Sequence, residues 1–389
     1  MGNSYSQLAT CDPFEISGDT VRPPQSNVRL SRWTARFGVV TSSLPKITKS
    51  TSSPTQVNKR PIIRPAIHGD AIGALAAVRP GMVISGGRDK LIALNNIDTG
   101  ECPLRWHGHD KEITKVAYRN VDGKHYILSG SRDANVKLWQ FNTPTTLCTF
   151  EGHQMSIMGL AMLEDHQCIS GSRDTTLKTW DLNTGTNLRT IRHPRNVVTH
   201  ISYCHSRNIL AQSSEDKELK IWDTKNLELI HQFPKKRHIQ THCDLVSDGN
   251  YCLSCSNGFN GDGCEISMWD VRQQKLLREF RGHEESVNCA VYIPQNVTWK
   301  RLVISVGADR TTKVWNADDS NCLWTEEIPA NADLLACVGF SDGNIVVSGL
   351  NATLVHLRLL GKAGRPFLQC ASIQSHSLRA SSTSQVDRR

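Results

Sequence analysis

Four segments of the chain repeat one order of apolar and polar positions. In SGSRDANVKLW, residues 129–139, a Gly, Ser and Asp turn is followed by Val136, Lys137, Leu138 and Trp139, which alternate with period two. Such alternation is typical of a half-buried β-strand, so each segment predicts two strands joined by a tight turn. The other copies keep six residues from Asp to Trp and lie at residues 170–180, 212–222 and 305–315.

Dipeptides recur at fixed places around these segments. A Gly-His pair precedes three copies, and a Trp-Asp pair closes three: Gly108-His109, Gly152-His153 and Gly282-His283; Trp180-Asp181, Trp222-Asp223 and Trp269-Asp270. In the order and spacing of these dipeptides, the chain resembles the WD-repeat family of β-propellers, whose blades are four-stranded sheets around a central channel. The resemblance implies a platform that binds other proteins.

The spacing of the tryptophans gives the number of copies. Trp139, Trp180, Trp222, Trp269 and Trp315 are 41 to 47 residues apart, close to the roughly 40 to 45 residues of a propeller blade. Two degenerate copies fit the same spacing: one has His68, Ser85, Asp89 and Asn95, and the other, residues 344–357, has His356 in place of Trp. The chain therefore predicts an all-β fold, a seven-bladed WD-repeat β-propeller over residues 61–374.

The family pattern implies a hydrogen-bonded tetrad in each regular blade, in which Trp donates to Ser, Ser meets His and His meets Asp. Three such tetrads are expected: His109, Ser129, Asp133 and Trp139; His153, Ser170, Asp174 and Trp180; His283, Ser305, Asp309 and Trp315. Ser, His and Asp also form catalytic triads, but a nucleophile needs an exposed hydroxyl beside a substrate pocket. Because these groups recur inside blades, we interpret them as part of the fold and expect no enzyme.

Two copies depart from the pattern. Gln212 stands where the fourth copy should have Ser, and the fifth copy has an insertion, residues 257–263, where its Asp turn should be. The fold does not need the extra residues, and loops on a rigid scaffold often carry function. Within and beside this insertion, the residues predicted to contact a partner are Asn257, Phe259, Asn260, Asp262 and Arg272.

A narrower resemblance surrounds the insertion. Residues 195–200, 238–249, 254–273 and 108–117 resemble one group of WD-repeat proteins that is linked to cilia and to regulators of small GTPases. This resemblance implies a non-enzymatic adaptor in cilium assembly or ciliary trafficking, with a cytoplasmic location at the cilium or the ciliary base.

A second hypothesis rests on Arg272. The residues Trp269, Asp270, Val271 and Arg272 fit the W-D-x-R element that substrate receptors of cullin-type ubiquitin ligases present to their adaptor. The element arises easily, and the insertion disturbs the residues ahead of it. The ligase receptor is therefore the alternative to the ciliary adaptor.

The N-terminal stretch differs in composition from the repeats. Residues 1–60 are rich in Ser, Thr and Pro, lack a sustained period, and carry eight basic against three acidic residues, which predicts a flexible, disordered leader. The first six residues fit the N-myristoylation motif with Gly2 as acceptor, and Cys11 lies near enough for a second acyl chain. One myristoyl group binds a bilayer only marginally, so a stable membrane anchor would also need Cys11 or the basic leader. A chance match in the leader is the alternative.

Charge argues against nucleic acid as a partner. The chain has a net charge of +8, but the leader and residues 361–389, with five basic and one acidic residue, account for all of it. A nearly neutral ring lacks the broad basic surface that phosphate backbones require. Residues 375–389 predict a second flexible tail.

The sequence does not support a bound cofactor or metal ion either. Thirteen cysteines are scattered without the spacing of a secreted disulfide framework, which favours the interior of a cell. Cys252, Cys255 and Cys264, with His238, His242 and Cys243 near in sequence, are candidate zinc ligands by residue type. Residues three apart on a strand face opposite sides, so we interpret these as buried free thiols. The sequence also lacks a Gly-rich phosphate loop followed by Lys-Ser.

Closure of the ring has two candidate strands. Ile62–Ile67 precedes the first copy, and Phe367–Ile373 follows the last one. Pro65 weakens the first segment because proline cannot donate to a strand ladder. We therefore expect the C-terminal segment to complete the last blade.

Overall fold

The structure is a computed structural model that describes residues 60–164, 166–193, 195–294, 301–330, 332–362 and 365–376. The predicted lipidation at Gly2 and Cys11 lies outside these residues, as do the leader before residue 60 and the tail after residue 376. The described strands extend from Ile62 to Gln374.

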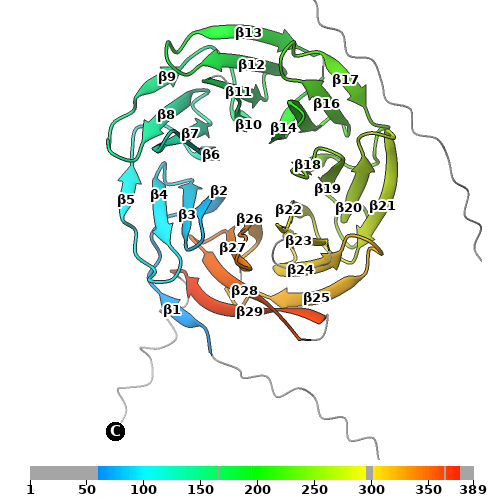
Figure 1. Cartoon of the computed structure of the whole chain (residues 1–389). Helices are drawn as coiled ribbons and strands as arrows, with labels where there is room; N and C mark the ends of the chain where they lie inside the picture. Colours follow the sequence, from blue (N-terminus) through cyan, green and yellow to red (C-terminus); the bar gives the residue numbers. More distant parts are fainter. Residues whose placement is uncertain are drawn as a thin grey trace, which may run out of the picture. The chain divides into compact units, whose positions relative to one another are not determined.

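Seven sheets, each with four antiparallel strands, are arranged in a ring (Figure 1) and form the seven predicted blades within the described residues. Blades 1 to 4 consist of β2 (Ile72–Arg79), β3 (Met82–Gly87), β4 (Ile92–Asn96) and β5 (Leu104–Trp106); β6 (Ile113–Val121), β7 (Lys124–Ser131), β8 (Val136–Gln140) and β9 (Cys148–Phe150); β10 (Ile157–Met162), β11 (Gln167–Ser172), β12 (Thr176–Asp181) and β13 (Asn187–Arg192); β14 (Val198–Cys204), β15 (Ile209–Ser214), β16 (Leu219–Asp223) and β17 (Leu229–Gln232).

The remaining blades complete the circle. Blades 5 to 7 consist of β18 (Gln240–Leu245), β19 (Tyr251–Ser256), β20 (Glu265–Asp270) and β21 (Lys275–Arg281); β22 (Val287–Tyr292), β23 (Leu302–Gly307), β24 (Thr311–Asn316) and β25 (Cys322–Glu327); β26 (Leu334–Gly339), β27 (Asn344–Gly349), β28 (Leu354–Lys362) and β29 (Arg365–Gln374). The fold is all-β, and no helix of the described part has the length and apolar character needed to cross a membrane.

The core lies between neighbouring blades. Ile84 and Ile92 of blade 1 pack with Ile113, Ile127 and Trp139 of blade 2 in one buried cluster, and comparable clusters join the other blades. The alternation along each strand thus turns one face toward each neighbour. A blade can bury both faces only inside the ring, as in other repeat architectures.

Hydrogen bonds between innermost strands add to this packing. Near the start of each of four innermost strands, an irregularity in the ladder leaves a polar side chain that donates to a backbone carbonyl of the next blade. The pairs are Thr114 with Ile157, Thr199 with Gln240, Thr241 with Val287, and Asn288 with Leu334, at 2.5 to 2.7 Å. These bonds fix the relative position of consecutive blades around the channel.

Both candidate segments take part in closure, in different roles. β29 pairs antiparallel with β28 as the fourth strand of blade 7, so this blade is built from the C-terminal segment alone. β1 (Ile62–Arg64) then adds a fifth strand in parallel, with Ile62 opposite Ser372. Pro65 follows β1 directly and so takes no place in its ladder. The N-terminal segment covers the outer edge of the closing blade, which would otherwise offer unpaired backbone groups.

Side chains also join blade 7 to blade 1. The Arg64 guanidinium donates to the carbonyl of Ile97 at 3.0 Å, and the Gln374 amide donates to the carbonyl of Gly100 at 3.0 Å. The ring therefore closes through packing, a covering strand and specific hydrogen bonds together.

We expect Leu368→Ala in β29 to lower the free energy of unfolding by about 2–5 kcal/mol, because Leu368 is 3% exposed in the core of the closing blade. Ile63→Ala in β1 is the matched control: Ile63 is 54% exposed, and its truncation should change stability by less than about 0.5 kcal/mol. Urea denaturation of both variants measures the difference. An equal loss for Ile63→Ala would show that β1 contributes as much to closure as β29 does.

Candidate protein-binding surface

The strand order puts two kinds of loop on one face of the ring. In each antiparallel sheet, the connection that enters the blade and the turn between its second and third strands lie at the same end. The connections carry His68, His109, His153 and His283, and the turns carry Asp89, Asp133, Asp174 and Asp309. We call this the tetrad face, and the other face the opposite face.

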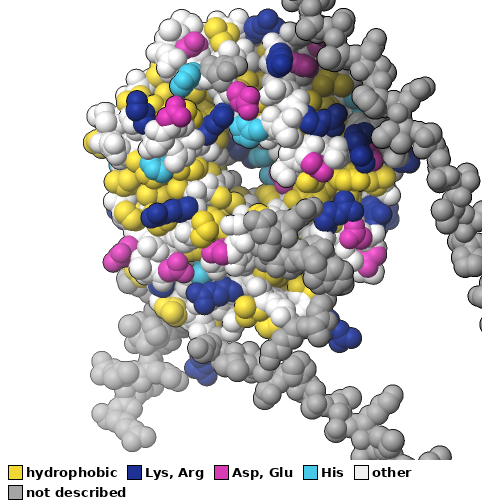
Figure 2. Space-filling model, viewed as in Figure 1, with side chains coloured by type: hydrophobic (Ala, Val, Ile, Leu, Met, Phe, Trp, Pro, Cys, Tyr) yellow, Lys and Arg dark blue, Asp and Glu magenta, His cyan; other side chains and the backbone are white. Residues whose placement is uncertain are grey.

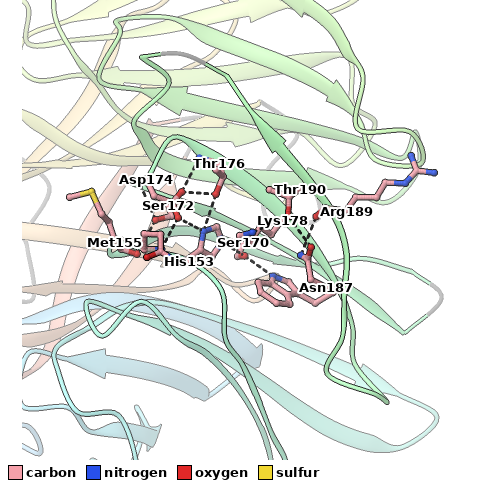
Figure 3. A network of polar contacts seen from close by, with 12 residues as sticks. His153, Met155, Ser170, Ser172, Asp174, Thr176, Lys178, Asn187, Arg189 and Thr190 are labelled. Carbon is pink, nitrogen blue, oxygen red and sulfur yellow. Dashed lines mark hydrogen bonds and ion pairs between the residues drawn. The ribbon is translucent and has the colours of Figure 1, made fainter.

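Blade 3 shows how a tetrad holds these loops (Figure 3). The Trp180 indole donates to Ser170 Oγ at 2.8 Å, and Ser170 Oγ lies 2.8 Å from His153 Nε2. His153 Nδ1 is 2.8 Å from the Asp174 carboxylate. Asp174 also accepts from the backbone N–H of Gln154, so the side-chain network fixes both loops.

The tetrads of blades 2 and 6 have the same geometry. Each Trp indole donates to its Ser at 2.8 Å, each Ser lies 2.7 Å from the His, and each His lies 2.7 to 2.8 Å from the Asp: Trp139, Ser129, His109 and Asp133; Trp315, Ser305, His283 and Asp309. The three serines, Ser170 included, are fully buried. A hydroxyl that is buried and already bonded on two sides cannot serve as a nucleophile.

The carboxylates of the tetrads are electrostatically stabilised. Burial alone would raise the pKa of Asp309, but its hydrogen bond with His283 and its bonds with Thr311 lower that pKa from 3.8 to about 2. The pKa values of Asp89, Asp133 and Asp174 are lowered against burial by the equivalent histidines. These groups are therefore charged in the folded protein at neutral pH.

Irregular blades rebuild the tetrad with other residues. In blade 1, Asn95 replaces Trp and donates to Ser85 Oγ at 2.8 Å. In blade 4, Trp222 donates to Gln212 Oε1 at 2.8 Å, and Gln212 Nε2 donates to Asn196 Oδ1 at 2.6 Å. The sequence did not indicate Asn196. Only Gln212 hinted at such a residue in the sequence. Its side chain is longer than that of Ser, so its partner must lie closer to the strand than the His of a Gly-His pair does.

Blades 5 and 7 keep less of the network. Trp269 donates to Ser254 Oγ at 2.9 Å across 15 residues of sequence, whereas regular blades span 10. His356 of blade 7 instead lies 2.8 Å from Asn344 Oδ1. Blade 5 thus gains loop length in the turn where its Asp would lie.

The insertion of blade 5 forms a hairpin tip. Phe259 and Asp262 pair as an antiparallel bridge, and both residues between them, Asn260 and Gly261, have positive φ values of 52° and 78°. An Asn-Gly pair with positive φ at both positions is typical of a type I′ turn. The Phe259 side chain is 65% exposed at this tip. Most large apolar side chains are buried, so an exposed aromatic on an ordered turn is a candidate contact.

The tip is held against neighbouring connections of the tetrad face. The backbone N–H of Gly261 donates to the carbonyl of Glu284 in the connection that enters blade 6, at 2.7 Å. Arg237, in the connection that enters blade 5, lies 3.0 Å from the Asp262 carboxylate. A Cβ on Gly263 would lie 2.2 Å from the His238 ring, so only glycine fits there. Asn257 donates its N–H to the carbonyl of Ile239 at 3.0 Å.

A cleft lies next to this tip on blade 6. Its volume is about 520 Å³, and Glu284, which anchors the tip, lines it together with Asp309, Arg310, Lys313, Glu327 and Pro329. The lining carries both signs of charge, which suits a polypeptide better than a phosphate backbone. The face drawn in Figure 2 likewise mixes Lys and Arg with Asp and Glu. We call Phe259, Asp262 and the cleft together the Phe259 surface.

Arg272 does not belong to the Phe259 surface. It lies in the turn between β20 and β21, on the opposite face, and its guanidinium is 3.5 Å from Asp270 and 5.6 Å from the centre of the Tyr251 ring. The side chain remains 49% exposed. The five residues predicted to contact a partner are therefore divided between two faces.

The cysteines that are candidate zinc ligands by residue type are buried in blade 5. Cys252, Cys255 and Cys264 are at most 2% exposed, and burial raises the pKa of each thiol. Within the described ranges, no three His, Cys, Asp or Glu side chains are placed to hold a metal ion.

Comparison with known proteins adds the class. The model of the WD domain, G-beta repeat, matches residues 100–140, 144–181, 185–223 and 274–316. The fold is a seven-bladed β-propeller, and the four matched segments support the WD-repeat family. Such a propeller is typically a non-catalytic scaffold that binds other proteins, and no enzyme family is indicated.

Several curated proteins resemble the chain at low identity. An uncharacterised WD repeat-containing protein of Schizosaccharomyces pombe is 23% identical over 61% of this chain and 63% of its own length. WD repeat-containing protein 37 of Xenopus tropicalis is 24% identical over 64% and 49% of the two chains. Human Pre-mRNA-processing factor 17 is 25% identical over 55% and 28%. The shared region is less than two thirds of each of these relatives.

We expect Asp309→Asn to lower the free energy of unfolding at pH 7 by about 1–3 kcal/mol, because it removes a charged acceptor of His283. The folded pKa of Asp309 is below its ordinary value, so the carboxylate's contribution is present above about pH 4 and is lost as the pH falls toward 2. The variant should therefore lose less stability than the wild type over this interval. Asp110→Asn, at an exposed side chain, is the control. Parallel acid limbs in wild type and Asp309→Asn would contradict the charged tetrad.

Proposed function

We propose that the protein is a non-enzymatic adaptor in cilium assembly or ciliary trafficking, associated with regulators of small GTPases and held near a membrane through its N-terminus. The observation that carries the adaptor role is the Phe259 surface, where a hairpin turn presents an aromatic side chain beside a charged cleft. Aromatic anchors at the centre of an interface, surrounded by polar contacts, often provide most of the binding free energy.

The ciliary assignment is supported by the narrower sequence resemblance. Residues 195–200, 238–249 and 254–273 resemble WD repeat-containing protein 31, and the last of these ranges includes the whole insertion. In the structure, the second and third ranges meet at the Phe259 surface, since His238 Nε2 lies 4.0 Å from the Asp262 carboxylate. The resemblance therefore includes the insertion that presents Phe259, together with residues 108–117 at the start of blade 2.

The relatives support the scaffold but carry no specific role here. Pre-mRNA-processing factor 17 and Telomerase protein component 1 of Rattus norvegicus align over 28% and 8% of their own lengths. Those shares are small enough that the name of either whole protein describes parts this chain does not match.

The membrane tether rests on Gly2 and Cys11. A myristoyl chain at Gly2 supplies marginal membrane affinity, and a second acyl chain or the basic leader supplies the rest. A location at the ciliary base, near the membrane, follows from combining this tether with the adaptor role.

Proximity labelling in ciliated cells tests the adaptor role. Fused to a biotin ligase, the intact chain should enrich ciliary-base, transport or GTPase-regulator proteins, and Phe259→Ala should lose them. Truncation of an interface anchor costs at least about 2 kcal/mol, or roughly thirtyfold in affinity. Leu188→Ala, at a 45% exposed position on the outer strand of blade 3, is the matched control. If Phe259→Ala keeps every neighbour, the Phe259 surface is not the binding site.

The same experiment decides the alternative of a ligase receptor. Arg272 is half-exposed in its turn, so a partner has access to the W-D-x-R element on the opposite face. Enrichment of cullin adaptors that Arg272→Ala abolishes, with Phe259→Ala unchanged, would replace the ciliary adaptor with the ligase receptor.

For the tether, we expect Gly2→Ala to move the protein from the membrane fraction to the soluble fraction of cell lysates, because alanine is not myristoylated. Cys11→Ser should give a partial shift, since one acyl chain remains. Fractionation with metabolic labelling by an alkyne analogue of myristate measures both. Equal membrane fractions for wild type and Gly2→Ala would remove the tether from the proposal and leave the adaptor role standing.

A further inference from the structure

The central channel contains a cluster of reactive side chains that the binding surface does not use. Lys115, His200, His242 and Cys289 occupy equivalent places on the innermost strands β6, β14, β18 and β22, each just after the irregularity in its ladder. Figure 2 shows His and Lys or Arg side chains at the edge of the hollow in the centre of the ring. The same position is occupied by Ala or Gly in the other three blades. One part of the channel wall is therefore chemically distinct.

Direct contacts join these side chains in a row. The rings of His200 and His242 lie 3.9 Å apart, and His242 Nε2 is 3.4 Å from Cys289 Sγ. The thiol of Cys337, on β26 of the next blade, donates to Cys289 Sγ at 3.6 Å. Cys289 and Cys337 are 3% and 5% exposed. Two sulfur atoms and an imidazole thus meet at one point where blades 6 and 7 adjoin.

The surroundings favour a thiolate at Cys289. The hydrogen bond from Cys337 lowers the pKa of Cys289 well below its ordinary range, and His242 acts in the same direction although burial opposes it. The same bond, together with burial, raises the pKa of Cys337. Burial lowers the pKa of Lys115 to about 8, so this cation also remains largely charged at neutral pH. His242 Nδ1 is buried and has no hydrogen-bond partner among the described residues.

The arrangement differs from that of an ordinary buried thiol. Burial raises the pKa of Cys168, Cys243, Cys252 and Cys255, which makes these groups inert. Oxidants select a low-pKa, accessible cysteine that lies next to a second cysteine, because the second thiol resolves the first product. Cys289 is 3% exposed, so peroxide must reach it from the channel.

We propose that Cys289 and Cys337 form a peroxide-sensitive dithiol in the channel, which hydrogen peroxide converts to a disulfide between blades 6 and 7. Cys289 is the attacking thiolate and Cys337 the resolving thiol, while His242, whose Nε2 lies 3.4 Å from Cys289 Sγ, positions the attacking sulfur.

The reaction balances with one molecule of hydrogen peroxide. The Cys289 thiolate attacks one peroxide oxygen, the O–O bond breaks, and Cys289 becomes a sulfenic acid as hydroxide leaves. Cys337 gives its proton to that hydroxide, forming water, and its sulfur attacks Cys289. The S–OH bond breaks, and the departing hydroxide takes up a proton from solvent, which replaces the one that Cys289 lost on becoming a thiolate, to form a second water. Each sulfur loses one electron, and the two peroxide oxygens gain them.

The geometry allows the bond to form. A disulfide has sulfur atoms about 2.05 Å apart, so the two atoms must approach by roughly 1.5 Å from their 3.6 Å separation. Rotation about the side-chain torsions of two neighbouring inner strands can share this movement. The product would be a covalent link across the last blade boundary before closure.

The test uses the purified full-length chain, reduced and then exposed to equimolar hydrogen peroxide for increasing times. After catalase treatment, the protein is denatured, alkylated and mapped by peptide mass spectrometry. We expect a Cys289–Cys337 disulfide, with a loss of two hydrogen masses, to form at least tenfold faster than oxidation of Cys322, the exposed reference thiol. Oxidation of Cys322 ahead of an unchanged Cys289–Cys337 pair would overturn the proposal without any variant.

Variants assign the roles. Cys337→Ser should accumulate a sulfenic acid at Cys289 that dimedone traps, whereas Cys289→Ser should leave Cys337 reduced. His242→Asn should slow oxidation at least tenfold, while His231→Asn, on the outer strand β17, should not. Unchanged kinetics in a folded His242→Asn would exclude a positioning role for His242. Equal trapping at both cysteines in the single variants would exclude the assignment of Cys289 as the attacking group.

Discussion

The burial of both faces of every blade against its neighbours is the constraint on which this structure depends. Ile84 and Ile92 of one blade share a cluster with Ile127 and Trp139 of the next, and no blade keeps its apolar faces to itself. Seven sheets satisfy this requirement only when the last meets the first. Closing the ring therefore matters more for stability than completing any single blade. The chain closes it with β29 as the fourth strand of blade 7 and with β1 as a fifth strand that covers the outer edge of that blade.

Within the closed ring, the tetrads connect surface loops to buried strands through hydrogen bonds. Each one ties a buried Trp to the connection and the turn of the tetrad face, so a polar chain in the core fixes the position of surface loops. In blade 4 other side chains form the same connection: Gln212 and Asn196 together span the distance that Ser and His span in regular blades. Blade 5 keeps the bond from Trp269 to Ser254, and its turn, which lacks the Asp of the tetrad, forms the hairpin that presents Phe259.

The proposed binding surface and the proposed dithiol occupy different places on one scaffold. The Phe259 surface lies on the tetrad face, where loops vary without disturbing the core. The dithiol lies in the channel, at positions set by irregularities of the innermost strands. Since Cys289 sits on β22 of blade 6, whose outer strands border the cleft, oxidation and binding would act on adjoining parts of the ring.

The sequence by itself determined the number of blades and most of their hydrogen-bonded tetrads. Period-two alternation, constant Asp-to-Trp spacing and a 41- to 47-residue period are local properties, so they placed seven copies, including the degenerate ones with Asn95 and His356. Tertiary structure decided what depends on contacts between distant segments. The pairing of β1 with β29, the role of Asn196, the docking of Gly261 on Glu284 and the approach of Cys289 to Cys337 all join residues of different strands or blades. No periodicity encodes these contacts, because the ring's curvature, rather than the order of residues, brings them together.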